Sequence, residues 1–309
     1  MSLDLVREII KENRVVSRES VQIIIENDII VPDTKPDIGR VLFADGDAFI
    51  LNTIVNDENI SIDGVIRHKI LYVEDNPEQN IISLNISTDF EHNMDVPGVG
   101  KGMEGRVKCE VEHVECRIVN GRKVNVRAIL RIKSKITEEN EYYFINDVED
   151  SEDIQILRGS VSINKFIGTG RGICTIKESF EVPSGNPSIM EILRNDIKIS
   201  NIEYKTTDNK VILKGEANIQ TLYAGDDRER SIKFMEHETT FTQVLDLPGI
   251  DDGSQVQLDY EIQNYSFEPL EDEDGEFRFM NGEIHIGIWI LGNIKEEMDL
   301  ITDIYGLRT

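Results

Sequence analysis

The residues that could bind a metal or act as nucleophiles are few and widely spaced. The chain has five histidines and three cysteines, and no histidine stands at metal-ligand spacing from another. Cys109 and Cys116 flank His113, but a zinc site needs a fourth ligand, and the sequence offers no obvious one. We therefore interpret both cysteines as small apolar core residues and predict no metal site of this kind.

Acidic turns are the remaining candidates for a metal site. Four aspartates in Gly-containing acidic segments offer oxygen ligands for calcium: Asp251, Asp252, Asp272 and Asp274. The spacing of an EF-hand loop is missing, and acidic turns are common at protein surfaces. We predict surface turns here, with calcium as the weaker interpretation.

No arrangement of residues is typical of catalysis. The glycine-rich segment 168–172 matches neither dinucleotide-binding nor phosphate-loop spacing, and it indicates a kinked or bulged strand. An Asp-x-Pro-Gly motif occurs twice and indicates a turn whose aspartate bonds its own backbone. Its residues are Asp95, Pro97 and Gly98, and then Asp246, Pro248 and Gly249. Because a catalytic site seldom needs two copies, we predict a scaffold role for this motif, no enzyme activity and no cofactor.

The Asp-x-Pro-Gly motif is part of an internal repeat at an offset of 151 residues. A Val-Pro-x-x-x-Pro-x-Ile-x-x-x-Leu motif at residues 31–42 returns at 182–193, and further matches follow in the same order. An ordered series at one offset indicates two tandem copies of one module. The prolines of the shared motif are Pro32, Pro36, Pro183 and Pro187.

Most of each copy alternates between apolar and polar residues, as strands do. Asn-Gly at 120–121 and Asp-Gly at 274–275 predict hairpin turns. Between Val111 and Val114, and again after Ile262, the alternation shifts by three residues, which predicts a β-bulge at the same place in each copy. We therefore predict an all-β fold of two antiparallel sandwich or barrel-like modules.

Three kinds of segment predict short helices. After its second proline, the repeated motif places Ile38, Val41 and Leu42 at i, i+3 and i+4, which predicts a helix that caps one end of each module. The two terminal segments show similar spacing. Their apolar residues are our candidates for assembly contacts: Leu3, Val6, Ile9, Ile10, Ile294, Met298, Ile301 and Tyr305.

The predicted domain organisation has five parts. A helical segment over residues 1–19 precedes the first module at 20–136, and a connecting segment that is partly strand follows over 137–175. The second module covers 176–292, and a helical tail covers 293–309.

Charge and cysteine content restrict the partners and the compartment. A net charge of −26 disfavours nucleic acids and anionic membranes, because like charges repel. The odd number of cysteines and the lack of signal-peptide features at the N-terminus predict a reducing cytosol during synthesis. No apolar run approaches the roughly 20 residues of a membrane span.

Several of the repeated blocks resemble the SPOCS domain family of clostridial sporulation proteins. They are the Ile-Ile-Val-Pro block at 29–38, the Ile-Leu-Tyr-Val block at 65–73, Phe90, the turn at 95–98, and the start of a second copy at 170–187. The resemblance implies a place in the mother cell or on the spore surface and implies no catalytic residues. One family member also carries a C-terminal LysM module; this chain shows none, so partners of that module are not implied.

From these observations we predict a non-enzymatic structural protein of the spore coat, exosporium or a spore appendage. It is expected to act through contacts with itself or with other coat proteins and to form a layer or filament. One alternative is a soluble monomeric adaptor for another coat protein. The other is a carbohydrate-binding β module, which the 6% aromatic content disfavours.

Overall fold

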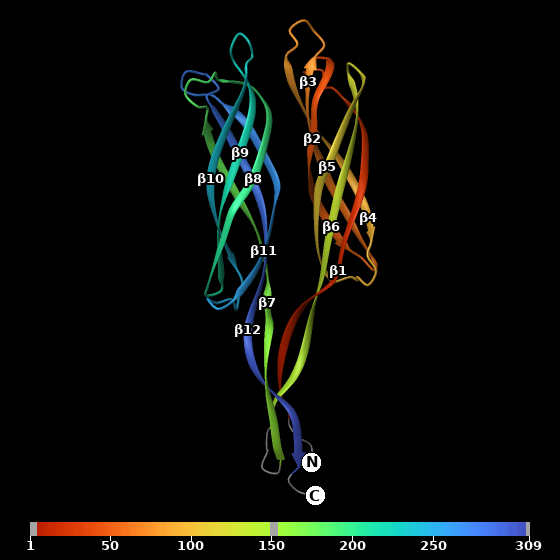
Figure 1. Ribbon diagram of the computed structural model, residues 1–309, viewed down its shortest axis with the longest axis vertical. Coiled ribbons are helices and arrows are strands. Elements are labelled where there is room, and N and C mark those ends of the chain that lie inside the picture. The colour runs from red at the N-terminus through yellow and green to blue at the C-terminus, as the bar shows by residue number, and fades with distance from the viewer. Residues whose placement is uncertain (1–4, 149–153, 307–309) are drawn as a thin grey trace.

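The computed structural model describes residues 5–148 and 154–306 and shows an all-β protein (Figure 1). Within these ranges there are twelve strands and no helix. The first module contains β1 (Leu5–Ile30), β2 (Ile38–Val55), β3 (Asn59–Glu74), β4 (Ile81–Asp95), β5 (Glu104–Asn120) and β6 (Lys123–Val148). The second contains β7 (Ile154–Glu181), β8 (Ile189–Thr207), β9 (Lys210–Gly225), β10 (Ile232–Asp246), β11 (Gln255–Leu270) and β12 (Phe279–Gly306).

Each module is a sandwich of two three-stranded antiparallel sheets. The first module combines β2-β3-β4 with β1-β6-β5, and the second combines β8-β9-β10 with β7-β12-β11. In the central strand β3, Ile60, Ile62 and Ile66 are fully buried and their neighbours less so, as the two-residue period of a strand requires. Each module has its own apolar core built from both of its sheets. The prediction of two tandem antiparallel β modules is confirmed.

The predicted bulges are present at equivalent places. In β5 the pairing register shifts between Val111 and His113, and in β11 it shifts between Ile262 and Asn264. One extra residue on each of these strands restores the inward phase after the three-residue step. The Asn-Gly and Asp-Gly segments form the predicted hairpin turns between β5 and β6 and between β11 and β12.

The helix predicted after the second proline of the repeated motif is wrong. Strand β2 begins at Ile38 and carries two closely spaced bulges near its start, at Gly39 and at Leu42, and a third at Leu51. Strand β8 carries the same two bulges, at Met190 and Leu193. Ile38 and Val41 pack on the core of the first module, whereas Leu42 is 44% exposed and its equivalent Leu193 packs between the modules. The bulges break the two-residue alternation, so the i, i+3 and i+4 spacing does not mark one face.

The predicted terminal helices are also wrong, because these segments are the outer halves of very long strands. Strand β1 pairs with β6 and β7 pairs with β12 along their whole lengths. Beyond the ends of β5 and β11 only these strands continue, and we call residues 5–14, 138–148, 154–165 and 294–306 the stalk. In β12 a bulge at Thr302 interrupts the alternation, whereas at Val6 the extra residue, Asn146, lies in the partner strand β6.

The two modules lie side by side with equivalent elements facing each other. In Figure 1 both strand pairs run down into the stalk, which ends at the same side as both chain termini. Strand β1 contacts β7 and β6 contacts β12, and these are equivalent pairs in the repeat. The arrangement is therefore close to a two-fold rotation about the long axis of the molecule.

Candidate interaction site

The repeated proline motif is held by side chains from elsewhere in each module. The buried Tyr72 hydroxyl donates to the Pro36 carbonyl at 2.8 Å, and the Tyr223 hydroxyl donates to the Pro187 carbonyl at 3.2 Å. Burial raises the pKa of Tyr72 to about 12, so this hydroxyl remains a donor throughout the physiological pH range. The motif is therefore anchored to the central strand of one sheet in each module, β3 in the first and β9 in the second.

Two arginines complete this anchor, and sequence reasoning missed both. The Arg122 guanidinium donates to the carbonyls of Val31 and Lys35 at 2.8 and 2.7 Å. Arg278 makes the equivalent bonds in the second module, to the carbonyls of residues 182 and 186 at 3.1 and 2.6 Å. Each arginine lies shortly after the glycine of a hairpin turn that was predicted from sequence. This shared position in the two copies could have identified both arginines before the structure was known.

The Asp-x-Pro-Gly motifs form turns at the stalk-facing end of each module. Gly98 and Gly249 have φ values of +84° and +88°, which a type II turn requires at the position after proline. Within the described residues, backbone bonds hold each turn to the preceding hairpin, such as Val96 N–H to the Glu58 carbonyl at 2.8 Å. The side chains of Asp95 and Asp246 are exposed and make none of these turn bonds.

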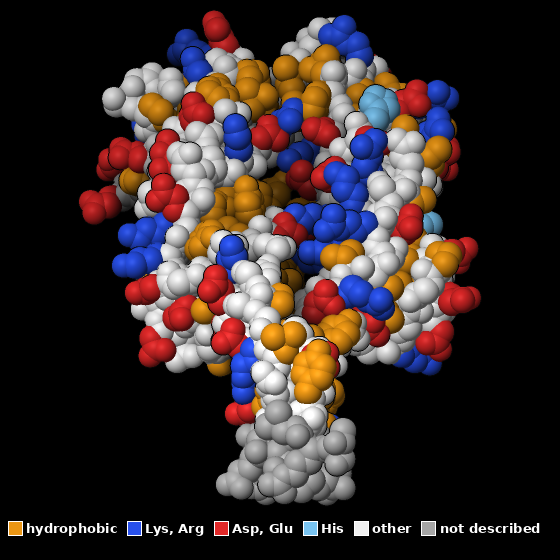
Figure 2. All heavy atoms as spheres, turned by 60° about the horizontal axis from the view of Figure 1, so that its bottom comes forward, with side chains coloured by type: hydrophobic (Ala, Val, Ile, Leu, Met, Phe, Trp, Pro, Cys, Tyr) orange, Lys and Arg blue, Asp and Glu red, His pale blue; other side chains and the backbone are white. Residues whose placement is uncertain are grey.

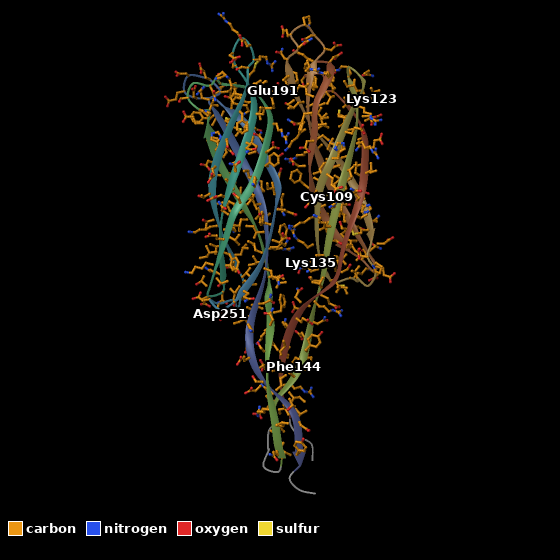
Figure 3. All side chains as sticks on the ribbon, viewed as in Figure 1. Cys109, Lys123, Lys135, Phe144, Glu191 and Asp251 are labelled. Carbon is orange, nitrogen blue, oxygen red and sulfur yellow. The ribbon has the colours of Figure 1, made fainter. Side chains whose placement is uncertain are left out.

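Near the far end from the stalk, the modules are joined through Glu191. Its Oε1 accepts from Lys35 Nζ at 2.5 Å and from Ser83 Oγ at 2.9 Å, both in the first module. Figure 3 shows Glu191 near the top of the second module, on the side that faces the first. An apolar cluster that includes the buried Leu71 and Leu193 lies between the modules in the same region.

The middle of the interface is a mixed polar and aromatic network. Lys69 Nζ lies 2.8 Å from an Asp47 carboxylate oxygen, and the Tyr265 hydroxyl of the second module also bonds to Asp47. Arg67 donates to the Tyr265 carbonyl at 2.7 Å and stacks near its ring. Burial, and then the Asp47 charge, raise the pKa of Tyr265 to about 12.

Nearest the stalk, four charged side chains join the modules. Arg106 lies 3.3 Å from both Asp259 and Glu261, and Lys108 pairs with Asp259. Burial favours the neutral form of Asp259, but the hydrogen bond and charge of Lys108 outweigh it and hold the pKa of Asp259 below its ordinary value. Burial dominates at Glu261 and raises its pKa despite Arg106.

Beside this ion-pair cluster the two modules leave a cleft of about 540 Å³. Its walls carry the only tryptophan of the chain, Trp289, with the Arg106 guanidinium stacked 3.1 Å from the ring centroid. Lys135 and Arg171 also line the cleft, and neither makes an ion pair within residues 5–148 and 154–306. Figure 2 shows Lys and Arg side chains gathered on one wall of the hollow between the modules and apolar side chains on the other.

Two buried polar atoms of the cleft lack hydrogen-bond partners within the described part of the chain. They are Arg106 Nη2 and Asn13 Oδ1. Buried polar atoms are normally paired, so orphaned atoms in a lined cleft are typical of a site that a polar ligand completes. The cleft is thus the strongest binding site that the structure offers.

A protein-family model for the SPOCS domain of SipL matches this chain twice, at residues 37–119 and 188–270, which together make just over half of its length. The chain belongs to the SipL SPOCS domain family. No curated protein and no solved structure matches it. SPOCS domains form a sporulation family and not an enzyme family, so membership associates the chain with sporulation and with protein contacts.

The matched ranges show how the SPOCS domain is distributed over the fold. Each match begins at the start of the first strand after the proline motif and ends at the hairpin before the last strand. The long strands β1, β6, β7 and β12 lie entirely outside the matches. The stalk, like the sandwich strands that lead into it, therefore lies outside the ranges that the family model matches.

The four aspartates considered for calcium are not brought together. Asp251 lies in the turn before β11, at the stalk-facing end in Figure 3, and accepts from Gly253 N–H at 3.0 Å. Asp272 lies in the hairpin at the other end of the same strand, where it accepts from Asp274 N–H at 3.0 Å. No group of three or more metal-ligating side chains occurs among the residues described.

The predicted assembly residues lie on the stalk, except that Leu3 falls outside the described residues. Ile10 and Met298 are buried, whereas Val6, Ile9 and Tyr305 are exposed. Sequence reasoning missed the further apolar side chains that the partner strands expose beside them: Tyr142, Tyr143, Leu157 and Val161. Within the described ranges, no helix has the length and apolar character needed to cross a membrane.

Proposed function

We propose that this SPOCS protein is a non-enzymatic structural component of the bacterial spore surface, in the coat, the exosporium or an appendage. It acts through protein–protein contacts and associates with itself into a layer or filament. It is made in the mother-cell cytoplasm and then becomes part of the spore surface. Membership in the SPOCS family supports the link to sporulation.

The observation that carries the proposal is the exposed apolar surface of the stalk. Tyr143 is 62% exposed, Leu157 54% and Tyr305 53%, and they come from three different strands. Large apolar side chains that are exposed together on one narrow element of the fold favour contacts with other proteins. Strands β1 and β7 also stand at sheet edges, where an extended segment of another chain can add.

Electron microscopy and light scattering of the purified chain test this proposal. We expect concentration-dependent association into particles that are long in one dimension. Substituting Tyr143, Leu157 and Tyr305 together by Ser is expected to reduce association, whereas substituting the exposed Ile54 and Leu51 of β2 by Ser is a matched control. A monodisperse monomer at high concentration would contradict self-association and would support the adaptor function.

A further inference from the structure

The two modules differ most in the hairpin at the end opposite to the stalk. In the first module, β5 and β6 are joined by the two residues 121–122. In the second, the segment 271–278 joins β11 to β12 and contains Glu-Asp-Glu-Asp-Gly-Glu at 271–276. The acidic side chains of this loop make no ion pair within the described residues. Asp272 alone is engaged, because its carboxylate bonds the backbone of the loop.

This acidic hairpin also exposes apolar side chains. Leu270 is 46% exposed and Phe277 is 39% exposed, on either side of the acidic turn. An exposed segment that combines several carboxylates with an aromatic ring is suited to a partner surface that offers cations and an aromatic wall.

The cleft between the modules has these complementary properties. Its lining holds three cations, Arg106, Lys135 and Arg171, against the two carboxylates of Glu104 and Asp259, so cations are in excess. Lys135 and Arg171 make no ion pair within the described residues, Arg106 Nη2 is a buried donor without a partner there, and Trp289 supplies an aromatic wall. A carboxylate could accept from Arg106 Nη2, and charge-assisted bonds of this kind are stronger than neutral ones. Since the chain has a net charge of −26, a cleft with a cationic wall is a local exception on an acidic molecule.

We propose that the cleft of one copy binds the acidic hairpin, residues 270–277, of a second copy. The cleft lies where the stalk begins, and the hairpin lies at the opposite end of the second module, in the blue loop at the upper left of Figure 1. A contact between unlike surfaces at opposite ends is heterologous, and it generates an open filament unless its rotation closes a ring. This inference rests on the proposed self-association and adds a second contact between copies, distinct from the exposed apolar surface of the stalk.

Complementary charge reversals test the proposal by sedimentation velocity. The cleft variant carries Lys135→Glu and Arg171→Glu, and the hairpin variant carries Glu273→Lys and Asp274→Lys, leaving the turn-forming Asp272 in place. Each is expected to raise the concentration for half-association at least about tenfold, which corresponds to about 1.4 kcal/mol. The control variant Arg40→Glu/Lys214→Glu reverses two exposed cations on β2 and β9 outside the cleft and is expected to associate like the unmodified chain.

Mixing the two variants distinguishes this contact from other causes of weak association. Each partner keeps one intact surface, so an equimolar mixture is expected to form 1:1 dimers, and because the two reversed surfaces are again opposite in charge, longer chains as well. Misfolding of either variant would abolish the dimer, and circular dichroism checks that both remain folded. Folded variants that associate as the unmodified chain does, or that fail to dimerise when mixed, would overturn the proposed contact while leaving self-association intact. An unmodified chain that stays monomeric would overturn self-association itself.

Discussion

The two SPOCS modules have the same scaffold, yet at their interface equivalent positions carry opposite properties. Lys108 and Asp259 are equivalent in the repeat, and they form an ion pair with each other across the interface. Phe43 and Arg194 are also equivalent, and the Arg194 guanidinium lies 4.2 Å from the Phe43 ring centroid. Near a two-fold axis, two identical modules would place like residues against each other. The differences between the copies therefore turn a self-repelling contact into an attractive one.

The same comparison reveals a buried histidine in only one module. His68 is 1% exposed, and the second module has the fully buried Ile219 at the equivalent position. Burial lowers the pKa of His68 to about 4, against about 6.5 in an unfolded chain. Between these values the unfolded state binds more protons, so the stability contributed by neutral His68 is complete above about pH 6.5 and is lost as the pH falls towards 4.

The largest expected effect is therefore on acid stability. Substituting His68→Ile copies the second module into the first and removes this proton linkage. Between pH 7 and pH 4, the free energy of unfolding is expected to fall by about 3 kcal/mol more in the unmodified chain than in the variant. Urea unfolding at both pH values measures the difference, and an identical pH dependence in the two proteins would refute the role of His68.

The next effect concerns a glycine that both modules place under a phenylalanine. A Cβ added at Gly64 would lie 2.4 Å from the Phe90 ring and 2.8 Å from a backbone oxygen, whereas a Cβ at Gly215 would meet only side chains, at 2.5 Å for Phe241. Side chains can shift more easily than backbone, so Gly64→Ala is expected to cost about 2–3 kcal/mol and Gly215→Ala about 1–2 kcal/mol. Urea unfolding measures the loss in free energy of unfolding for each variant. A larger loss for Gly215→Ala than for Gly64→Ala would contradict the ranking that the backbone contact at Gly64 predicts.

A smaller effect is expected from making the interface symmetric. The substitution Asp259→Lys places a second cation against Lys108 and removes a partner of Arg106. Because these groups are partly exposed, the loss is expected to be about 1–2 kcal/mol. The swap variant Lys108→Asp/Asp259→Lys restores an opposite-charge pair and is expected to recover part of the loss. A double-mutant cycle by thermal unfolding measures this coupling, and purely additive losses would argue against the pair.

The smallest expected effect concerns the reactivity of the Cys109 and Cys116 thiols, which have no cysteine equivalents in the second module. Burial raises the pKa of Cys109 to about 12 and that of Cys116 to about 11, where the second module has Tyr260 and Phe267 instead. Few thiolates exist at pH 8, so reaction with iodoacetamide is expected to be slow in the folded chain and fast in urea. Mass spectrometry of the time course measures both rates. Rapid labelling of the folded protein would show that these thiols are accessible and ionised.

The sequence was informative where one local pattern has one structural meaning. The repeat, the hairpin at Asn120-Gly121 and the bulge after Val111 all depend on neighbours along the chain, and each is present in the structure. The apolar spacing of Ile38, Val41 and Leu42 was misleading, because bulges at Gly39 and Leu42 break the two-residue alternation and leave a spacing like that of a helical turn.

The candidate site was harder to predict because residues far apart in sequence build it. The cleft combines Arg106 from β5, Lys135 from β6, Arg171 from β7 and Trp289 from β12. Only Arg171 lies in a segment that the sequence singled out, the glycine-rich stretch 168–172, and only the near two-fold pairing of the modules brings the four residues together. The sequence led us to place the assembly contacts on the terminal segments. The acidic hairpin became a candidate contact only because the structure shows that it lies at the opposite end of the molecule.

Cross-linking between isotopically distinct copies tests the central claim most directly. Equal amounts of unlabelled and ¹⁵N-labelled chains are mixed, allowed to associate and treated with a carbodiimide, which joins amines directly to carboxylates. We predict mixed-isotope cross-links between Lys135 and the carboxylates of residues 271–276. Mixed cross-links that are confined to the stalk, or an absence of any between copies, would contradict a head-to-tail contact between cleft and hairpin.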